Sequence, residues 1–162
     1  MRSLQVLGLC VMFPIAALTG CDDDGAGPDL LTIADFAGSW EATTYRLTHA
    51  QIPAITLEVI SLGVTLEMDA NASGTFTGSA FIPAVLVGQD LDLDFGGTFS
   101  LVGQDSLIIN FVPEVPPLLT QTRAAFQLAG NVLTMTDQDT TFDFDGDGTE
   151  EPAIFEGTLV RN

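Results

Sequence analysis

The clearest pattern in the chain is Thr75-Phe76-Thr77-Gly78-Ser79-Ala80-Phe81-Ile82, in which apolar and polar side chains alternate. In an extended chain, Phe76, Ala80 and Ile82 share one face, while the opposite face begins with the hydroxyl residues Thr75, Thr77 and Ser79. Successive side chains of a β-strand point to opposite sides of a sheet. The stretch therefore predicts a strand with one buried face and one wet face, an arrangement typical of antiparallel sheets.

The same alternation recurs through most of the chain and is interrupted regularly by turn residues. Leu91, Leu93 and Phe95, for example, alternate with Asp92 and Asp94. The predicted strands are Trp40–His49, Ile60–Met68, Thr75–Leu86, Leu91–Phe95, Thr98–Val102, Leu107–Val112, Leu119–Leu128, Val132–Thr136 and Ala153–Arg161. Short strands at this spacing predict an antiparallel all-β domain.

The alternation changes phase once. Ile55, Leu57 and Val59 occupy odd positions, whereas the apolar residues from Ile60 to Met68 occupy even positions. A shift of one residue moves every side chain to the other face of a sheet, so a bulge or turn is needed near Val59-Ile60 to keep both sets inside.

Two segments resemble each other and support a hairpin arrangement. Phe99–Gly103 followed by Leu107–Ile109 is similar to Phe126–Gly130 followed by Leu133–Met135. Each copy consists of a strand, a glycine-containing turn and a second strand. Consecutive hairpins build a meander, so we predict an antiparallel up-and-down barrel of about eight strands, with a β-sandwich as the alternative.

The N-terminal residues resemble the signal peptide of bacterial lipoproteins. Leu18-Thr19-Gly20-Cys21 matches a lipobox, and it follows Arg2 and the apolar run Leu4–Ala17, which is too short for a membrane span. The resemblance implies that residues 1–20 are removed and that Cys21 carries palmitate and other acyl chains. It places the protein in the bacterial cell envelope, anchored to the inner or outer membrane, with its domain in the periplasm or at the cell surface. The alternative is that Cys10 and Cys21 are ordinary residues of a leader.

The segment between the lipobox and the first strand has two parts. Residues 21–29 are acidic and contain no large apolar side chain, which predicts a flexible tether. Leu30–Phe36 carries apolar residues at helical spacing and predicts a short helical turn packed on the end of the domain. The predicted barrel domain spans residues 30–162.

The chain is strongly acidic, with a formal net charge of −18. Without residues 1–20 it contains no lysine, and its fixed cations are Arg46, Arg123 and Arg161. Such a protein repels phosphate groups, so nucleic-acid binding is excluded and membrane attachment depends on the lipid at Cys21. We expect a monomer.

The start of the first strand resembles a known family. Gly38-Ser39-Trp40 is similar to the Gly-x-Trp signature of lipocalins and other calycins, and the hairpin around Leu66–Asp69 and Gly74–Phe76 adds to the resemblance. The family implies a lipocalin-like barrel in which Trp40 closes one end. Arg161, near the end of the last strand, then packs across Trp40 and hydrogen-bonds the N-terminal turn.

This resemblance leads to two functional hypotheses. One is a module that binds a small apolar ligand inside the barrel. The other is a structural or interaction lipoprotein whose barrel is filled by its own side chains. An eight-stranded barrel is only just wide enough to be filled. Large residues such as Phe95 and Phe99 favour a filled interior, whereas Gly78 and Ala124 favour space.

The main cluster of possible metal ligands is Asp143-Phe144-Asp145-Gly146-Asp147-Gly148, which matches the first half of a calcium-binding loop. The Thr149 carbonyl and the Glu151 carboxylate are further candidate ligands. The match ends at the twelfth position of the loop, where Ile154 replaces the usual glutamate. The alternative is a solvated acidic turn.

The sequence contains little that supports catalysis. His49 is the only histidine, and no nucleophile motif such as Gly-x-Ser-x-Gly occurs. We therefore expect that the protein is not an enzyme.

Overall fold

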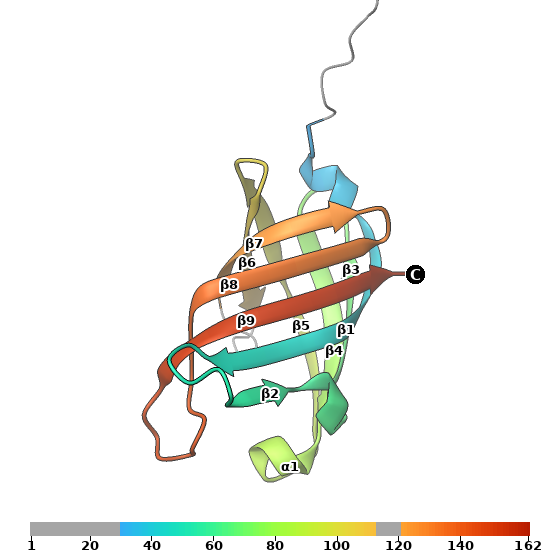
Figure 1. The fold of residues 1–162 in the computed structure, drawn as a ribbon. Helices are drawn as coiled ribbons and strands as arrows, with labels where there is room; N and C mark the ends of the chain where they lie inside the picture. The colour runs from blue at the N-terminus through green and yellow to red at the C-terminus, as the bar shows by residue number, and fades with distance from the viewer. Residues whose placement is uncertain (1–29, 113–120) are drawn as a thin grey trace, which may run out of the picture.

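The computed structural model describes residues 30–112 and 121–162, which form a closed antiparallel β-barrel (Figure 1). In order, the elements are η1 (Ile33–Phe36), β1 (Gly38–His49), β2 (Thr56–Glu58), η2 (Ile60–Leu62), β3 (Thr65–Ala70), β4 (Thr75–Ile82), α1 (Ala84–Val87), β5 (Leu91–Val102), β6 (Ser106–Val112), β7 (Thr122–Ala129), β8 (Val132–Phe142) and β9 (Glu151–Arg161). Among these residues, no helix is long and apolar enough to cross a membrane.

Eight strands make up the barrel wall. From β3 to β9 each strand pairs with the next, β3 pairs with β1, and β9 returns to pair with β1 from Trp40↔Arg161 to His49↔Ala153. All of these pairings are antiparallel. The predicted up-and-down meander barrel is confirmed, and the β-sandwich alternative is wrong.

The predicted turn near Val59-Ile60 is also confirmed, but the strand predicted over Ile60–Met68 is wrong at its start. Residues 60–62 form the 3₁₀ turn η2, which ends at Gly63 with φ +96°, and β3 begins only at Thr65. The preceding β2 pairs with the second half of β1, whereas β3 pairs with the first half. The turn keeps Val59 buried against Val64 and Ile82.

Two other predicted boundaries differ in the middle of the chain. The strand predicted over Thr75–Leu86 ends at Ile82, because Pro83 has no N–H to donate and precedes α1. The strands predicted over Leu91–Phe95 and Thr98–Val102 are one continuous strand, β5. Gly97 is a point of close approach in that strand, since a Cβ there would overlap the Asn110 carbonyl oxygen of β6.

The C-terminal strands are longer than predicted. Strand β8 continues past Thr136 to Phe142, and a bulge between Asp137 and Thr140 shifts its phase. The strand predicted over Leu119–Leu128 appears as β7 from Thr122, and its first residues lie outside the described part of the chain.

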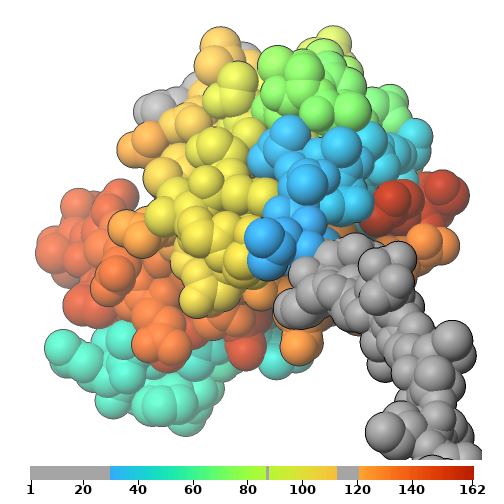
Figure 2. Space-filling model, turned by 90° about the horizontal axis from the view of Figure 1, so that it is seen from above, coloured from blue at the N-terminus to red at the C-terminus, as the bar shows by residue number. Residues whose placement is uncertain are grey.

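The N-terminal turn covers one end of the barrel. The predicted helical turn within Leu30–Phe36 is confirmed as η1, and the buried Phe36 packs edge-on against Phe99 and Phe126. Figure 2, which looks onto this end, shows the first described residues in blue lying across it. Residues 1–29, which include Cys21 and the predicted signal peptide and tether, lie outside the described residues.

Candidate functional site

The end of the barrel covered by η1 is held together by Trp40 and Arg161. Trp40 is 1% exposed, and its indole N–H donates a hydrogen bond to the Phe36 carbonyl at 2.8 Å. The Arg161 guanidinium lies 4.6 Å from the centroid of the Trp40 ring. It also donates to the carbonyl oxygens of Ala37 at 3.2 Å and Asp35 at 3.0 Å. The structure thus brings together the two residues predicted to close the barrel.

A capping interaction stabilises the turn that Arg161 contacts. The Asp35 carboxylate accepts hydrogen bonds from the Thr32 backbone N–H at 2.6 Å and from the Thr32 hydroxyl at 2.9 Å. These bonds favour the charged carboxylate and hold the pKa of Asp35 below its usual value.

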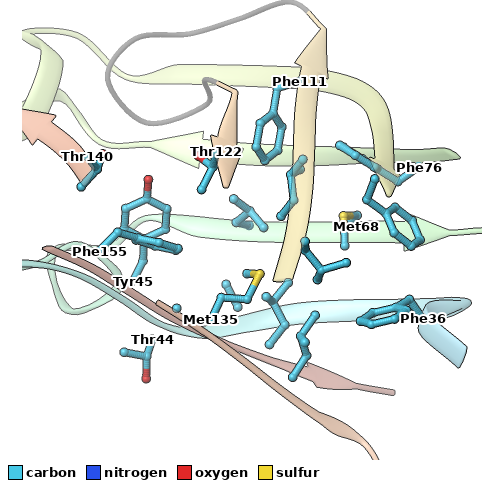
Figure 3. A pocket seen from close by; sticks show the side chains of 18 residues that line it. Phe36, Thr44, Tyr45, Met68, Phe76, Phe111, Thr122, Met135, Thr140 and Phe155 are labelled. Atoms are coloured by element: carbon cyan, nitrogen blue, oxygen red, sulfur yellow. The ribbon is translucent and has the colours of Figure 1, made fainter. Parts of the chain in front are cut away.

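The barrel encloses a cavity of about 80 Å³ (Figure 3). Eighteen residues line it, from η1 and from all eight strands of the barrel wall, and most of its surface is hydrocarbon. The aromatic part of the lining consists of Phe36, Tyr45, Phe76, Phe99, Phe111 and Phe155. The cavity therefore offers dispersion contacts on most sides.

Aromatic rings limit the size of this cavity. Phe76 packs against Phe95, Phe99 and Phe111, with ring centroids 5.4 to 6.3 Å apart. An apolar cavity of about 150 Å³ is large enough to bind benzene in an engineered protein. The present cavity is about half that volume, so the side chains fill most of the barrel but leave space for a small group.

Tyr45 lines the cavity and remains a neutral phenol. Its ring lies 4.8 Å from that of Phe155, and burial raises the pKa of its hydroxyl because the phenolate would lose its hydration. Tyr45 therefore offers a hydroxyl, and no charge, to the interior at neutral pH.

The structure also brings together four carboxylates, three from the connection between β8 and β9 and one from the first residue of β9. One oxygen from each of Asp143, Asp145, Asp147 and Glu151 lies within 4.8 Å of the others. The fifth predicted ligand, Thr149, belongs to the same connection, and its backbone N–H donates to Asp147 at 2.7 Å. Four of the five predicted ligand residues thus have carboxylates that lie close together, at a partly exposed site.

The Asp143 carboxylate organises residues 143–151, which we call the acidic loop. It accepts backbone hydrogen bonds from Gly146 at 2.7 Å, Asp147 at 3.2 Å and Gly148 at 2.8 Å. These bonds hold the pKa of Asp143 below its usual value. Gly146 and Gly148 adopt φ values of +74° and +87°, a region that favours glycine.

His49 is buried, which its place in the sequence did not predict. Its Nδ1 atom accepts backbone hydrogen bonds from Gln51 at 3.1 Å and Ile52 at 3.3 Å, so the proton of the neutral ring lies on Nε2. The ring stacks on Phe144 of the acidic loop at 5.4 Å. His49 thus anchors the segment after β1.

Asp137 was also missed. It is 9% exposed, and its carboxylate accepts the Asp139 N–H at 2.9 Å. It lies on β8 opposite Phe155 and continues the buried series of Leu133 and Met135, but the predicted strand ended one residue earlier, at Thr136.

The arginines of the wall do not line the cavity. Arg46 forms ion pairs with Glu58 at 3.3 Å and Glu156 at 3.4 Å, and the Arg46 side chain is about half exposed. Arg123 is exposed on β7. Among the described residues that surround the cavity, none carries a formal charge at neutral pH.

No protein-family model matches the chain, and no curated protein matches it.

Proposed function

We propose that this protein is a lipid-anchored barrel that binds a small apolar ligand in its interior. The proposal is supported mainly by the cavity of about 80 Å³, whose lining is mostly hydrocarbon. Ligand sites are typically apolar concavities with a few polar groups, and the barrel interior has that composition. Its small volume restricts the ligand to a few heavy atoms unless side chains move.

The anchor is proposed from the sequence, on the lipobox that ends at Cys21. The described chain starts next to η1, at the end sealed by Trp40 and Arg161 (Figure 1). A lipid on Cys21 would attach the barrel by this end, leaving the opposite end and its loops farther from the membrane. The proposed location is the bacterial cell envelope.

Binding is tested by adding benzene or hexane to the protein and recording the NMR signals of methionine methyl groups. Met68 and Met135 both line the cavity, so their methyl NMR signals in the full chain should shift saturably with ligand. Ala42 also lines the cavity, and Ala42→Leu should weaken the response by filling space. An outward-facing Thr134→Leu variant of β8 is the control.

The filled-barrel hypothesis predicts a different result. If neither hydrocarbon shifts the two methionine signals saturably, the interior holds no ligand and the protein acts through its outer surface as a structural or interaction lipoprotein.

We also propose calcium binding by the acidic loop. The proposal is supported by the convergence of Asp143, Asp145, Asp147 and Glu151 within 4.8 Å, because Ca²⁺ prefers several oxygen ligands. Millimolar calcium should then raise the melting temperature, and magnesium should raise it less. The double variant Asp145→Asn/Asp147→Asn should lose the calcium response, with Asp92→Asn/Asp94→Asn as the control. Identical melting curves with and without calcium would support the solvated turn.

A further inference from the structure

The two ends of the cavity differ chemically. Phe36 and Phe76 lie toward one end, whereas Tyr45, Thr122 and Thr140 lie toward the other (Figure 3). The strand register agrees with this view. Thr140 of β8 pairs with Ala153, which is near the start of β9. Arg161 is the last residue of β9, so Thr140 lies far from the end of the barrel that Arg161 seals. Hydroxyl groups are thus gathered at the end of the cavity remote from η1.

These hydroxyls can both donate and accept hydrogen bonds. A hydroxyl carries one donor and two acceptor positions, so it can serve a ligand and a protein neighbour together. Thr122 belongs to β7 and Thr140 to β8, and the Tyr45 ring extends from β1 toward them (Figure 3). Three strands therefore supply polar contacts to one region of an otherwise apolar cavity.

The electrostatic surroundings disfavour an anionic ligand. Arg46 is paired outside the barrel, and Arg161 is bonded to carbonyl oxygens at the opposite end. A carboxylate ligand would be buried without a cationic partner, and this opposes its binding.

The volume limits the length of the ligand. The cavity of about 80 Å³ has about half the volume that binds the six carbons of benzene, so as it stands it fits a short chain with a small head group. A six-carbon chain fits only if flexible lining side chains such as Met68 and Met135 move.

Building on the function proposed above, we propose that the ligand is an uncharged amphiphile with one short chain. Its hydroxyl or carbonyl head binds at Thr122 and Thr140, and its hydrocarbon tail lies against Phe36 and Phe76. Because the hydroxyl groups lie at one end of the cavity and the phenylalanine rings at the other, the ligand binds in one orientation.

The proposal is tested by comparing hexan-1-ol, hexanoate and hexane on the purified full chain. The measurement is the saturable shift of the Met68 and Met135 methyl signals. We expect hexan-1-ol to bind about threefold to tenfold more tightly than hexane, corresponding to one or two net hydrogen bonds. Hexanoate should bind at least about tenfold more weakly than hexan-1-ol, because its charge remains unpaired.

Variants locate the head group. Thr140→Val should weaken hexan-1-ol binding by about threefold to tenfold while leaving hexane binding unchanged, since it removes a hydroxyl but keeps the side-chain shape. Thr122→Val should act in the same direction. Thr134→Val, an exposed position of the same strand as Thr140, is the matched control and should change neither ligand.

The outcomes separate this inference from the proposed function. If hexane and hexan-1-ol bind equally and Thr140→Val affects neither, the barrel binds apolar ligands but the head-group assignment is wrong. Tighter binding of hexanoate than of hexan-1-ol also overturns the assignment. If none of the three binds, the proposed function itself fails.

Discussion

The Arg161 guanidinium lies 4.6 Å from the centre of the Trp40 ring, although the two residues come from the last and first strands of the barrel. They are direct neighbours in the β1–β9 register, and this pairing closes the sheet. Arg161 also binds the backbone of the N-terminal turn at Asp35 and Ala37. One side chain thus links barrel closure to the covering of one end.

Arg161→Ala should lower the free energy of unfolding. The lost cation–π contact alone contributes about 0.5–2 kcal/mol, and the hydrogen bonds to Asp35 and Ala37 add to it. Trp40 emission should shift to longer wavelength as water reaches the ring. Denaturant unfolding followed by fluorescence measures both effects, with the exposed Arg123→Ala as the control. Equal midpoints and spectra for the two variants would contradict this role.

Gly97→Ala should destabilise the barrel by about 1–3 kcal/mol, because the new methyl group overlaps the Asn110 carbonyl and the Phe76 ring. Ala125→Gly, at an exposed position of β7, removes a methyl group without any overlap and is the comparison. Thermal unfolding measures the difference. Wild-type stability of Gly97→Ala would show that β5 and β6 are not packed as closely as described.

Stability should fall in acid partly through Asp143. Its pKa is lower in the folded protein than in the unfolded chain, so its contribution is present above the unfolded value and is lost as pH falls through the folded value. Asp143→Asn should therefore reduce the pH dependence of unfolding below about pH 4. Urea unfolding at a series of pH values tests this, and an unchanged slope in the variant would contradict it.

His49→Phe should loosen the segment after β1. Phenylalanine keeps an aromatic ring beside Phe144 but removes the Nδ1 acceptor used by the Gln51 and Ile52 amides. These two amides should exchange with deuterium faster than in the wild type. Exchange at Ala50, whose N–H bonds the Pro152 carbonyl, is the internal reference. Unchanged rates at Gln51 and Ile52 would show that the ring nitrogen does not hold this segment.

Alternation of side chains predicted most of the barrel, because inward and outward faces follow a period of two along β3, β4 and β5. The errors arose where backbone geometry changes that period. The bulge after Asp137 interrupts the alternation, so the second half of β8 was not predicted. The two strands predicted on either side of Gly96-Gly97 are one strand, in which the glycine allows β5 to approach β6 closely.

The candidate sites were predictable to different degrees. The acidic loop is contiguous in sequence, so Asp143 to Glu151 could be grouped without a structure. The polar end of the cavity combines Tyr45, Thr122 and Thr140 from three strands, and only the closed register brings them to one region. The remaining cavity volume depends on how the aromatic rings pack, which no local pattern specifies.

A crystal structure of the full chain soaked with hexan-1-ol shows directly whether the barrel interior binds a ligand. We expect one hexan-1-ol molecule inside the barrel, with its hydroxyl within hydrogen-bond distance of Thr122 or Thr140 and its tail toward Phe36. An interior without ligand, or hexan-1-ol bound only on the outer surface at saturating concentration, would mean that the barrel is filled by its own side chains.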